Sequence, residues 1–404
     1  MANSKNIELR KKQYVNTLLG IIRREPPASR SLLKKASGLS METVLQTVEG
    51  LLADGTIYES GSGGAPVGRK ATWLSINPQA WYYLGVKFTD LKLCGVLMDF
   101  DGQAALTREV SFSERVTVAE LLRGMRGCIT ELLDSLGERK DRVRGIGVGV
   151  PGVLDREEGV SLRYANIQDL SGVPIKRLLE EEFGLPVRVE QALKITLTAH
   201  RMAAENAKLR DMLFVLVKSG VGMAALLNGR LHYGTGHWEG EIGHLQVAYP
   251  GRRCSCGRFG CLESEIGYRA LRARMEEGLA QGGFPILRAR LEGREPRVED
   301  LIQALALGDP DAALLFGHAC GLLADVVVHA VVMLNPQKII FSGELTGGTG
   351  FLDSMSQAIA ERCPREAAKT LALEATTTDD AFDALGAAYL MMNEEFPMNA
   401  ALRP

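Results

Sequence analysis

Apolar positions in the N-terminal part of the chain recur with the period of α-helices and predict three helices in succession. Residues 7–24 carry an apolar stripe, and two prolines end that helix because proline cannot continue a helical backbone. A short helix over 31–36 follows, and either Ser29 or Ser31 can cap it. Beyond a glycine turn, Ser40 is placed to cap a third, longer helix.

The third helix, over 41–54, is followed by two short strand-like stretches, 56–60 and 71–76, around a glycine-rich loop. Helix, short helix, tight turn, longer helix and β-hairpin make the element order of a winged helix-turn-helix. The apolar positions of the third helix that we expect to face the core are Val44, Leu45, Val48, Leu51 and Leu52.

Charge supports a nucleic-acid role for this part of the chain. Residues 1–76 carry eleven Lys and Arg against six Asp and Glu, whereas the remainder carries 36 basic and 43 acidic side chains. In this motif the third helix presents its first polar side chains to the major groove of double-stranded DNA. Because the third helix itself has no basic residue, a winged helix that binds protein stays an alternative. The residues expected to contact bases or phosphates are Lys34, Lys35, Ser40, Glu42, Thr43, Gln46, Thr47, Arg69 and Lys70.

Beyond residue 80 the pattern becomes that of an α/β fold built from two related halves. Each half begins with strand, turn and strand, near 82 and near 212, and later strands and helices follow both. Two such modules facing each other predict the actin-like, ribonuclease H-like fold with two lobes. We expect a winged-helix domain over 1–78, a first lobe over 79–192 with about 385–404, and a second lobe over 193–384.

Length and composition are those of a globular protein with more than one core. The chain has 404 residues, of which 46% are hydrophobic and 24% charged. Its longest apolar run, 320–334, is interrupted by charge and predicts a buried helix rather than a membrane span. The first residues lack an apolar leader, so we expect a cytoplasmic protein. Four scattered cysteines are expected to be reduced, buried thiols: Cys94, Cys128, Cys320 and Cys363.

Three further cysteines lie within eight positions: Cys254, Cys256 and Cys261, with His244 ten residues upstream. Three thiolates and one imidazole form a closed tetrahedral set for zinc, and neighbouring arginines favour thiolate formation. We therefore expect zinc in a loop over 244–263. The alternatives are a disulfide or free thiols, and a zinc knuckle that contacts RNA.

The spacing His-x9-Cys-x-Cys-Gly-x2-Gly-Cys-x-Glu, with GEIGH before it, resembles the signature of the ROK family of repressors, open reading frames and sugar kinases. The segments GVGVPGVLD, YANI, FGLPVRVE, NGRL, LNPQKIIFSG and ALGAAYL follow in family order. The resemblance implies an actin-like, sugar-binding domain. The N-terminal winged helix resembles that of ROK transcriptional regulators, since kinases of the family lack it.

The resemblance also implies which residues a kinase would use, and several are changed here. Where the family has the aspartate that accepts a proton from the sugar, this chain has Ala192, which cannot do so. The second phosphate loop is reduced to KSGVG at 218–222. We expect no catalytic residue and no phosphoryl transfer, and an active sugar kinase with a regulatory head is the alternative. In the first phosphate loop, the family has Asp-x-Gly-Gly-Thr. Here Lys87 replaces the aspartate, Thr89 and Asp90 replace the two glycines, and Leu91 replaces the threonine.

The sugar-contacting residues that the resemblance implies are present in this chain to a greater extent than the residues of the phosphate loops. Gln191 replaces a family asparagine, and its longer amide can still donate and accept hydrogen bonds. We expect a DNA-binding repressor of carbohydrate metabolism that acts as a homodimer or homotetramer and senses a sugar or sugar derivative. A vestigial pocket with control by a protein partner is the alternative. The expected ligand-binding residues are Gly152, Asn166, Gln191, Glu241, His244 and Glu263.

Overall fold

The computed structural model describes residues 2–63, 71–112, 116–164, 166–377 and 379–396. The chain forms two compact units. The first unit comprises residues 1–199 and 380–404, and the second comprises residues 200–379.

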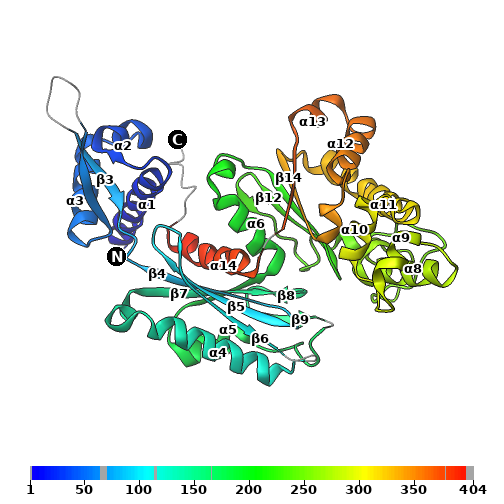
Figure 1. Cartoon of the computed structure of the whole chain (residues 1–404). Helices are drawn as coiled ribbons and strands as arrows, with labels where there is room; N and C mark the ends of the chain where they lie inside the picture. Colours follow the sequence, from blue (N-terminus) through cyan, green and yellow to red (C-terminus); the bar gives the residue numbers. More distant parts are fainter. Residues whose placement is uncertain (1, 64–70, 113–115, 165, 378, 397–404) are drawn as a thin grey trace. The chain divides into compact units, whose positions relative to one another are not determined.

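The first unit begins with three helices and a small antiparallel sheet of strand order β1-β3-β2, as a winged helix requires (Figure 1). The predicted cap at Ser40 is confirmed, since its hydroxyl accepts from the Thr43 N–H at 3.1 Å; of the two candidates for the second helix, Ser29 is the cap, and its hydroxyl accepts from the Leu32 N–H at 3.2 Å. The elements are α1 (Ala2–Arg24), β1 (Ala28–Ser29), α2 (Arg30–Ser37), α3 (Met41–Ala53), β2 (Ile57–Gly63) and β3 (Ala71–Ile76).

The core of this head is formed by one face of each helix, and one predicted core residue is wrong. Val44, Val48 and Leu51 of α3 are buried as expected, but Leu45 is 38% exposed. Each residue step turns a helix by about 100°, which carries Leu45 out of the stripe that its neighbours form. Met41, one turn earlier, is 39% exposed on α3.

A five-stranded sheet of order β10-β7-β4-β5-β6 forms the rest of the first unit, with a small β8–β9 hairpin. β4 is parallel to β7 and antiparallel to β5, and β10 continues the sheet in parallel beyond β7. Its strands are β4 (Tyr82–Phe88), β5 (Lys92–Asp99), β6 (Ala104–Ser111), β7 (Val143–Val150), β8 (Val153–Asp155), β9 (Val160–Arg163) and β10 (Val187–Gln191). Its helices are α4 (Val118–Asp134), η1 (Gly137–Arg142), α5 (Ile175–Phe183), α6 (Ala192–Met202) and α14 (Asp380–Glu395).

Helix α14 packs closely on one face of this sheet, while α4 and α5 cover the other (Figure 1). Glycines in the strands allow the close approach. A Cβ on Gly85 would lie 1.8 Å from the Ala384 carbonyl oxygen, and one on Gly147 would lie 1.9 Å from that of Ala387. No side chain fits in that space, so the sequence of β4 and β7 determines how near α14 can lie.

The second unit repeats the same sheet topology, which confirms the prediction of two related halves. Its order, read from the far edge, is β15-β14-β11-β12-β13, with β11 antiparallel to β12 and parallel to β14. The strands are β11 (Met212–Val217), β12 (Val221–Leu227), β13 (Arg230–Leu231), β14 (Lys338–Ser342) and β15 (Ala372–Thr376). The longer helices are α8 (Tyr268–Ala280), α10 (Val298–Ala306), α11 (Pro310–Leu334) and α12 (Phe351–Arg362). The short ones are η2 (Ala204–Asn206), η3 (Ile242–His244), α7 (Leu262–Ile266), α9 (Pro285–Leu291), η4 (Glu344–Gly347) and α13 (Arg365–Thr370).

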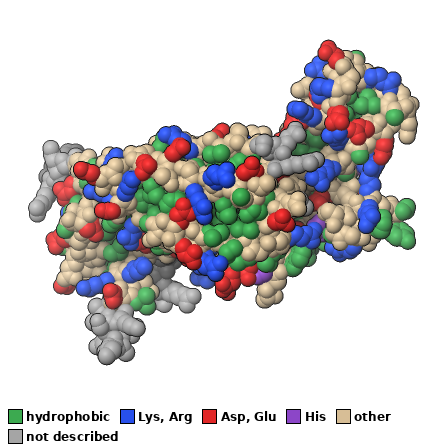
Figure 2. Space-filling view, turned by 90° about the horizontal axis from the view of Figure 1, so that it is seen from below, with side chains coloured by type: hydrophobic (Ala, Val, Ile, Leu, Met, Phe, Trp, Pro, Cys, Tyr) green, Lys and Arg blue, Asp and Glu red, His purple; other side chains and the backbone are tan. Residues whose placement is uncertain are grey.

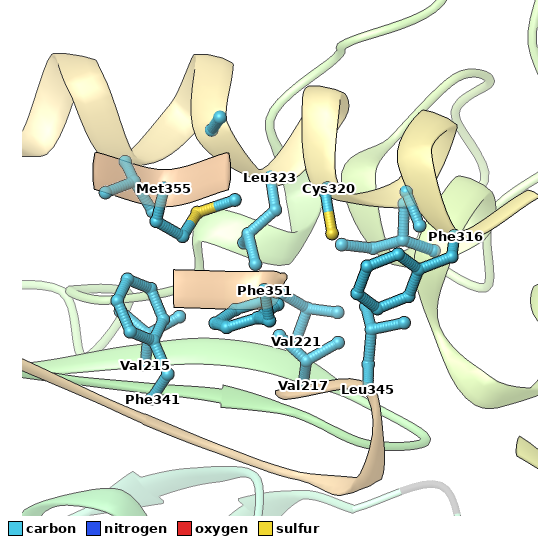
Figure 3. Packing of buried hydrophobic residues seen from close by; sticks show 14 of the residues in the cluster. Val215, Val217, Val221, Phe316, Cys320, Leu323, Phe341, Leu345, Phe351 and Met355 are labelled. Carbon is cyan, nitrogen blue, oxygen red and sulfur yellow. The ribbon is translucent and has the colours of Figure 1, made fainter. Parts of the chain in front are cut away.

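Helix α11 is central to the core of the second unit. Its Phe316, Cys320 and Leu323 are buried in one cluster with Val217 of β11 and Phe341 of β14 (Figure 3). The helix has 25 residues and begins before the apolar run from which we predicted it. By length and composition it is the one helix in the described residues that could cross a membrane, but 56% of its apolar window is buried inside the protein. This burial confirms the prediction of a core helix.

Candidate functional site

The four predicted metal ligands lie together in the second unit. The ligand atoms of His244, Cys254, Cys256 and Cys261 all lie within 4.8 Å of one another. Cys256 Sγ is 3.7 Å from Cys261 Sγ, and Cys254 Sγ is 3.5 Å from His244 Nδ1. Ligands held 2.0–2.3 Å from a tetrahedral ion are separated by about 3.4–3.8 Å from each other. The cluster therefore has the donor types and the spacing of a tetrahedral metal centre.

Backbone hydrogen bonds in the loop bring these side chains together. The Cys254 N–H donates to the Arg258 carbonyl at 2.8 Å, and the Gly257 N–H donates back to the Cys254 carbonyl at 3.0 Å. Isolated β-bridges join Arg253 to Phe259 and Gln246 to Cys261. These contacts fold the segment over itself, so that cysteines separated by up to seven positions share one site.

Cys256 and Cys261 have opposite pKa shifts, and contact between the neighbouring thiols contributes to both. Burial raises the pKa of Cys256, but hydrogen bonds from the Arg258 backbone and side chain and from the other thiols outweigh it and bring the pKa to about 6. Burial, and then Cys256 and Cys254, raise the pKa of Cys261 to about 12. One thiol thus ionises at the expense of another, and a bound cation would allow all three to be thiolates.

The two ring nitrogens of His244 have different neighbours. Nδ1 faces Cys254, whereas Nε2 lies 3.7 Å from a carboxylate oxygen of Glu241. A carboxylate beside the second nitrogen is a common arrangement for a metal-binding histidine, because it orients the ring and favours one tautomer. Glu241, which we predicted to bind ligand, is therefore placed to orient His244 if a metal binds there.

Glu263 connects the cysteine loop to strand β12. One of its carboxylate oxygens accepts from the Val221 N–H at 3.4 Å, and the other lies 3.5 Å from the hydroxyl of Ser255, between two of the cysteines. Val221 belongs to the segment that replaces the second phosphate loop of the kinases. A carboxylate at this backbone N–H would repel a phosphate group that approached it.

In the first unit, the three predicted ligand residues form a connected group. The Gln191 side-chain N–H donates to the Gly152 carbonyl at 3.3 Å. Gly152 has φ of +82°, and a Cβ there would lie 2.1 Å from the Arg163 carbonyl and 3.3 Å from the Tyr164 Cα. The Tyr164 hydroxyl in turn accepts from the Asn166 amide at 3.3 Å. Tyr164 belongs to this group but was not among our predicted site residues, although it is the first residue of the YANI segment.

Gln191 has an unsatisfied buried atom. Its side chain is 8% exposed, and its Oε1 is buried without a hydrogen-bond partner among the described residues. A buried acceptor without a donor costs about 1–3 kcal/mol. This atom is therefore suited to accept a hydrogen bond from a hydroxyl group that the protein itself does not supply.

In the turn that we compared with the first phosphate loop of the kinases, three of the backbone N–H groups are bonded within the turn. The Thr89 N–H donates to the Lys92 carbonyl at 2.8 Å, and the N–H groups of Leu91 and Lys92 each donate to the Thr89 hydroxyl at 3.2 Å. In a phosphate loop such N–H groups face the phosphate instead. Asp90 of the same turn accepts from the Tyr164 hydroxyl at 3.1 Å.

Lys87, which replaces the first aspartate of that loop, is held by α14. Its ammonium donates to Asp380 at 2.8 Å and also to Asp383, which accepts from the Thr196 hydroxyl at 2.7 Å. The side chain of Asp383 is only 4% exposed. The positive charge of Lys87 is therefore already paired within the first unit.

The predicted DNA contacts divide into two groups in the head. The hydroxyls of Ser40, Thr43 and Thr47 make hydrogen bonds within α3 and its cap. Glu42 and Gln46 are exposed on α3, and Lys34 and Lys35 are exposed on α2. Arg69 and Lys70 lie outside the described residues. On the face seen in Figure 2, basic and acidic side chains are interspersed.

The paired sheets and the N-terminal head define an actin-like α/β protein with a winged-helix domain. The chain belongs to the ROK family, because residues 83–394 match the ROK family model. A xylose repressor from Caldicellulosiruptor bescii is 24% identical over 83% of this chain and 84% of its own length. The DNA-binding transcriptional dual regulator NagC of Escherichia coli K12 is 26% identical over 84% of this chain and 82% of its own length.

Solved structures agree on the fold. A ROK family transcriptional regulator, described as a homolog of the E. coli Mlc protein, superposes with a TM-score of 0.83 at 22% identity, over 97% of this chain and 98% of that one. A ROK hexokinase from Thermus thermophilus gives a TM-score of 0.63 at 24% identity, over 78% of this chain and 99% of the hexokinase. The head therefore has a counterpart in the regulator.

Proposed function

We propose that this protein is a sequence-specific, DNA-binding regulator of carbohydrate metabolism whose ROK region senses a sugar or sugar derivative without phosphorylating it. The fold of the head and the names of the relatives, which are repressors and a DNA-binding regulator of transcription, support DNA binding. Repression is the favoured direction because both xylose and N-acetylglucosamine repressors are among these relatives.

The observation that carries the proposal of a non-catalytic protein is the closed turn at 89–92. The N–H groups of Thr89, Leu91 and Lys92 are bonded within the turn, so these three cannot also bind a phosphate. Ala192 begins α6 where a kinase would have its proton acceptor. Catalysis of phosphoryl transfer depends on positioning and charge stabilisation of the phosphate and on a proton acceptor. A protein that lacks all three has no means of accelerating the reaction.

Sugar sensing is supported by the buried Oε1 of Gln191 and by the carboxylates of Glu241 and Glu263. Hydroxyl groups of a sugar donate to such acceptors and accept from amides. The residues that we propose as ligand contacts are Gly152, Asn166 and Gln191 within the first unit, and Glu241, His244 and Glu263 within the second unit, each unit being considered by itself.

Zinc is the metal that we propose for the cysteine cluster. Three thiolates and one imidazole at tetrahedral spacing suit zinc, which is not redox-active and stabilises loops with little apolar core. His244 would bind through Nδ1, the nitrogen that faces Cys254. The metal would then be structural, and its removal would loosen the loop that carries Glu263.

On DNA, we propose that Glu42 and Gln46 of α3 contact bases, with Ser40, Thr43 and Thr47 beside them. Lys34 and Lys35 would contact phosphates, as would Arg69 and Lys70 of the wing. A homodimer or homotetramer would place two recognition helices on a two-fold operator. Such a regulator acts in the cytoplasm, where a bacterial operator is accessible.

Two assays test this proposal with the full-length protein. Fluorescence anisotropy with fragments of upstream DNA should detect salt-dependent binding that a sugar reverses. A coupled ADP-release assay across D-glucose, D-xylose, N-acetylglucosamine and N-acetylmannosamine should detect no turnover. Turnover at ordinary kinase rates would instead identify a sugar kinase with a regulatory head, and DNA binding that no sugar alters would favour control by a protein partner.

A further inference from the structure

Asp90 lies at the tip of the β4–β5 turn, and the turn fixes its position. Thr89 closes the turn through its backbone and hydroxyl group, and Lys87, two residues earlier, is held by Asp380 and Asp383. Leu91, the other residue at the tip, is 59% exposed. Among the described residues, the carboxylate of Asp90 accepts a hydrogen bond from the Tyr164 hydroxyl, which lies 74 residues further along the chain.

The number of donors and acceptors in each group determines which residue donates in the hydrogen bond between Tyr164 and Asp90. An ionised carboxylate only accepts, so the single hydroxyl hydrogen of Tyr164 is donated to Asp90. The Tyr164 oxygen can then only accept from Asn166, which must present its N–H₂ group at 3.3 Å. Burial, and then the charge of Asp90, raise the pKa of Tyr164, so the phenol keeps its proton. The contact with Asp90 therefore determines that the N–H₂ end of the Asn166 amide faces Tyr164.

The same segment also contacts the rest of the predicted ligand group. The Tyr164 backbone packs against Gly152, whose carbonyl accepts from Gln191. A displacement of Tyr164 would therefore affect both amides that we propose to contact a sugar. The chain has gained, in the turn where kinases have glycine, a carboxylate that holds this segment in place.

We propose that Asp90 is a positioning residue of the ligand site, which acts through Tyr164 to orient the amide of Asn166 toward the sugar. The inference rests on the proposed function, because it requires a sugar to bind at Asn166. It assigns a role to a residue that a comparison with kinases would class only as a loss. Asp90 does not touch the sugar itself.

The test compares Asp90→Gly, Asp90→Asn and Tyr164→Phe in the full-length, metal-loaded protein. Affinity is measured by calorimetry for whichever of D-glucose, D-xylose and N-acetylglucosamine binds the unchanged protein most tightly. Asp90→Gly and Tyr164→Phe should weaken binding by on the order of tenfold, the value of about one hydrogen bond and its orientation. Asp90→Asn should stay within about threefold, because its amide oxygen still accepts from Tyr164. Leu91→Ala, in the same turn, is the matched control.

A double-mutant cycle separates positioning from a general effect on stability. If Asp90 acts through Asn166, adding Asp90→Gly to Asn166→Ala should cost little further affinity. Additive losses, or equal losses in Asp90→Asn and Asp90→Gly, would overturn the inference. If Asn166→Ala weakens binding while Asp90→Gly does not, this inference alone fails. If no sugar binds, or Asn166→Ala leaves affinity unchanged, the proposed sugar site fails and the inference fails with it.

Discussion

The ammonium group of Lys87 lies 2.8 Å from a carboxylate oxygen of Asp380, the first residue of α14. Both side chains are only 13% exposed, and Asp383, one turn further along α14, shares the same ammonium. This ion pair joins residues separated by 293 positions. It links α14, the last described helix, to β4 in the sheet of the first unit.

Replacing Lys87 by methionine should lower the free energy of unfolding by about 3 kcal/mol, because Asp383 would be left buried without its cation. Urea denaturation followed by circular dichroism measures this loss. Lys92→Met is the matched control: Lys92 also pairs with Asp380 but is 48% exposed, so its loss should cost less than about 1 kcal/mol. Equal effects of the two substitutions would contradict the assignment of a buried ion pair.

The contribution of this ion pair should also depend on pH. Burial raises the pKa of Asp380, but Lys87 and Lys92 outweigh it and lower the pKa below 3.8, so the stabilisation is present above 3.8 and is lost as pH falls through the lowered pKa. Burial lowers the pKa of Lys87, but Asp383 and Asp380 raise it above 10.5, so the stabilisation is present below 10.5 and is lost as pH rises through the raised pKa. The stability difference between Lys87→Met and the unchanged protein should be constant between about pH 5 and 9 and shrink outside that range.

Replacing Cys256 by serine should release the metal and lower the melting temperature by several degrees, because a hydroxyl is a poor ligand for zinc. Metal content by plasma mass spectrometry and melting by calorimetry check this. Cys363→Ala is the control, since that thiol is buried away from the cluster and should leave the metal in place. Full metal content in Cys256→Ser would remove Cys256 from the ligand set.

Replacing Gln46 by alanine should weaken binding to the operator by about 1–3 kcal/mol and leave binding to unrelated DNA almost unchanged, as expected for a base contact. Replacing Lys34 and Lys35 together should weaken binding to the operator and to unrelated DNA alike. It should also reduce the slope of log affinity against log salt by about two. Anisotropy titrations at several salt concentrations distinguish the two patterns. A uniform loss in Gln46→Ala would move this residue from the bases to the phosphates.

Replacing Glu263 by alanine should abolish the sugar-dependent release of DNA, because the carboxylate that joins the cysteine loop to Val221 would be lost. Glu263→Gln should keep part of the response, since its amide oxygen can still accept from the Val221 N–H. Glu361→Ala, an exposed carboxylate on α12, serves as the control. A normal response in Glu263→Ala would show that the sugar does not depend on this residue.

Restoring the proton acceptor alone should not restore a kinase. Ala192→Asp should show no ADP release above background, because the N–H groups of Thr89, Leu91 and Lys92 are still bonded within their turn. Adding Lys87→Asp should also destabilise the protein, since three carboxylates would then meet where one ammonium now neutralises two. Turnover by the Ala192→Asp protein would mean that the turn opens for a nucleotide.

The sequence predicted the features that depend on neighbouring residues. The caps at Ser29 and Ser40 and the cysteine cluster are local, because each is formed by residues that lie close together along the chain. The repeated strand, turn and strand pattern predicted two sheets of the same topology. The prediction that Leu45 faces the core was wrong, because an apolar residue at the edge of a helical stripe can face either the core or the solvent.

The sequence did not predict the contacts that cross the fold. From the sequence we interpreted Asp90 only as a replacement in the first phosphate loop, because its partner Tyr164 lies 74 positions away. Lys87 was likewise interpreted only as a replacement, since its partners Asp380 and Asp383 come from a helix almost three hundred residues later. Such pairings depend on which elements the topology brings together, and no periodicity in the chain encodes them.

The close packing of α14 against Gly85 and Gly147 has a consequence for synthesis on the ribosome. The strands that it covers are made early, but the helix emerges only after the whole of the second unit, 200–379. Until then, one face of the first sheet stays uncovered, while the second unit already has all the strands of its own sheet. The sheet of the first unit therefore receives its covering helix only after all the strands of the inserted unit have been made.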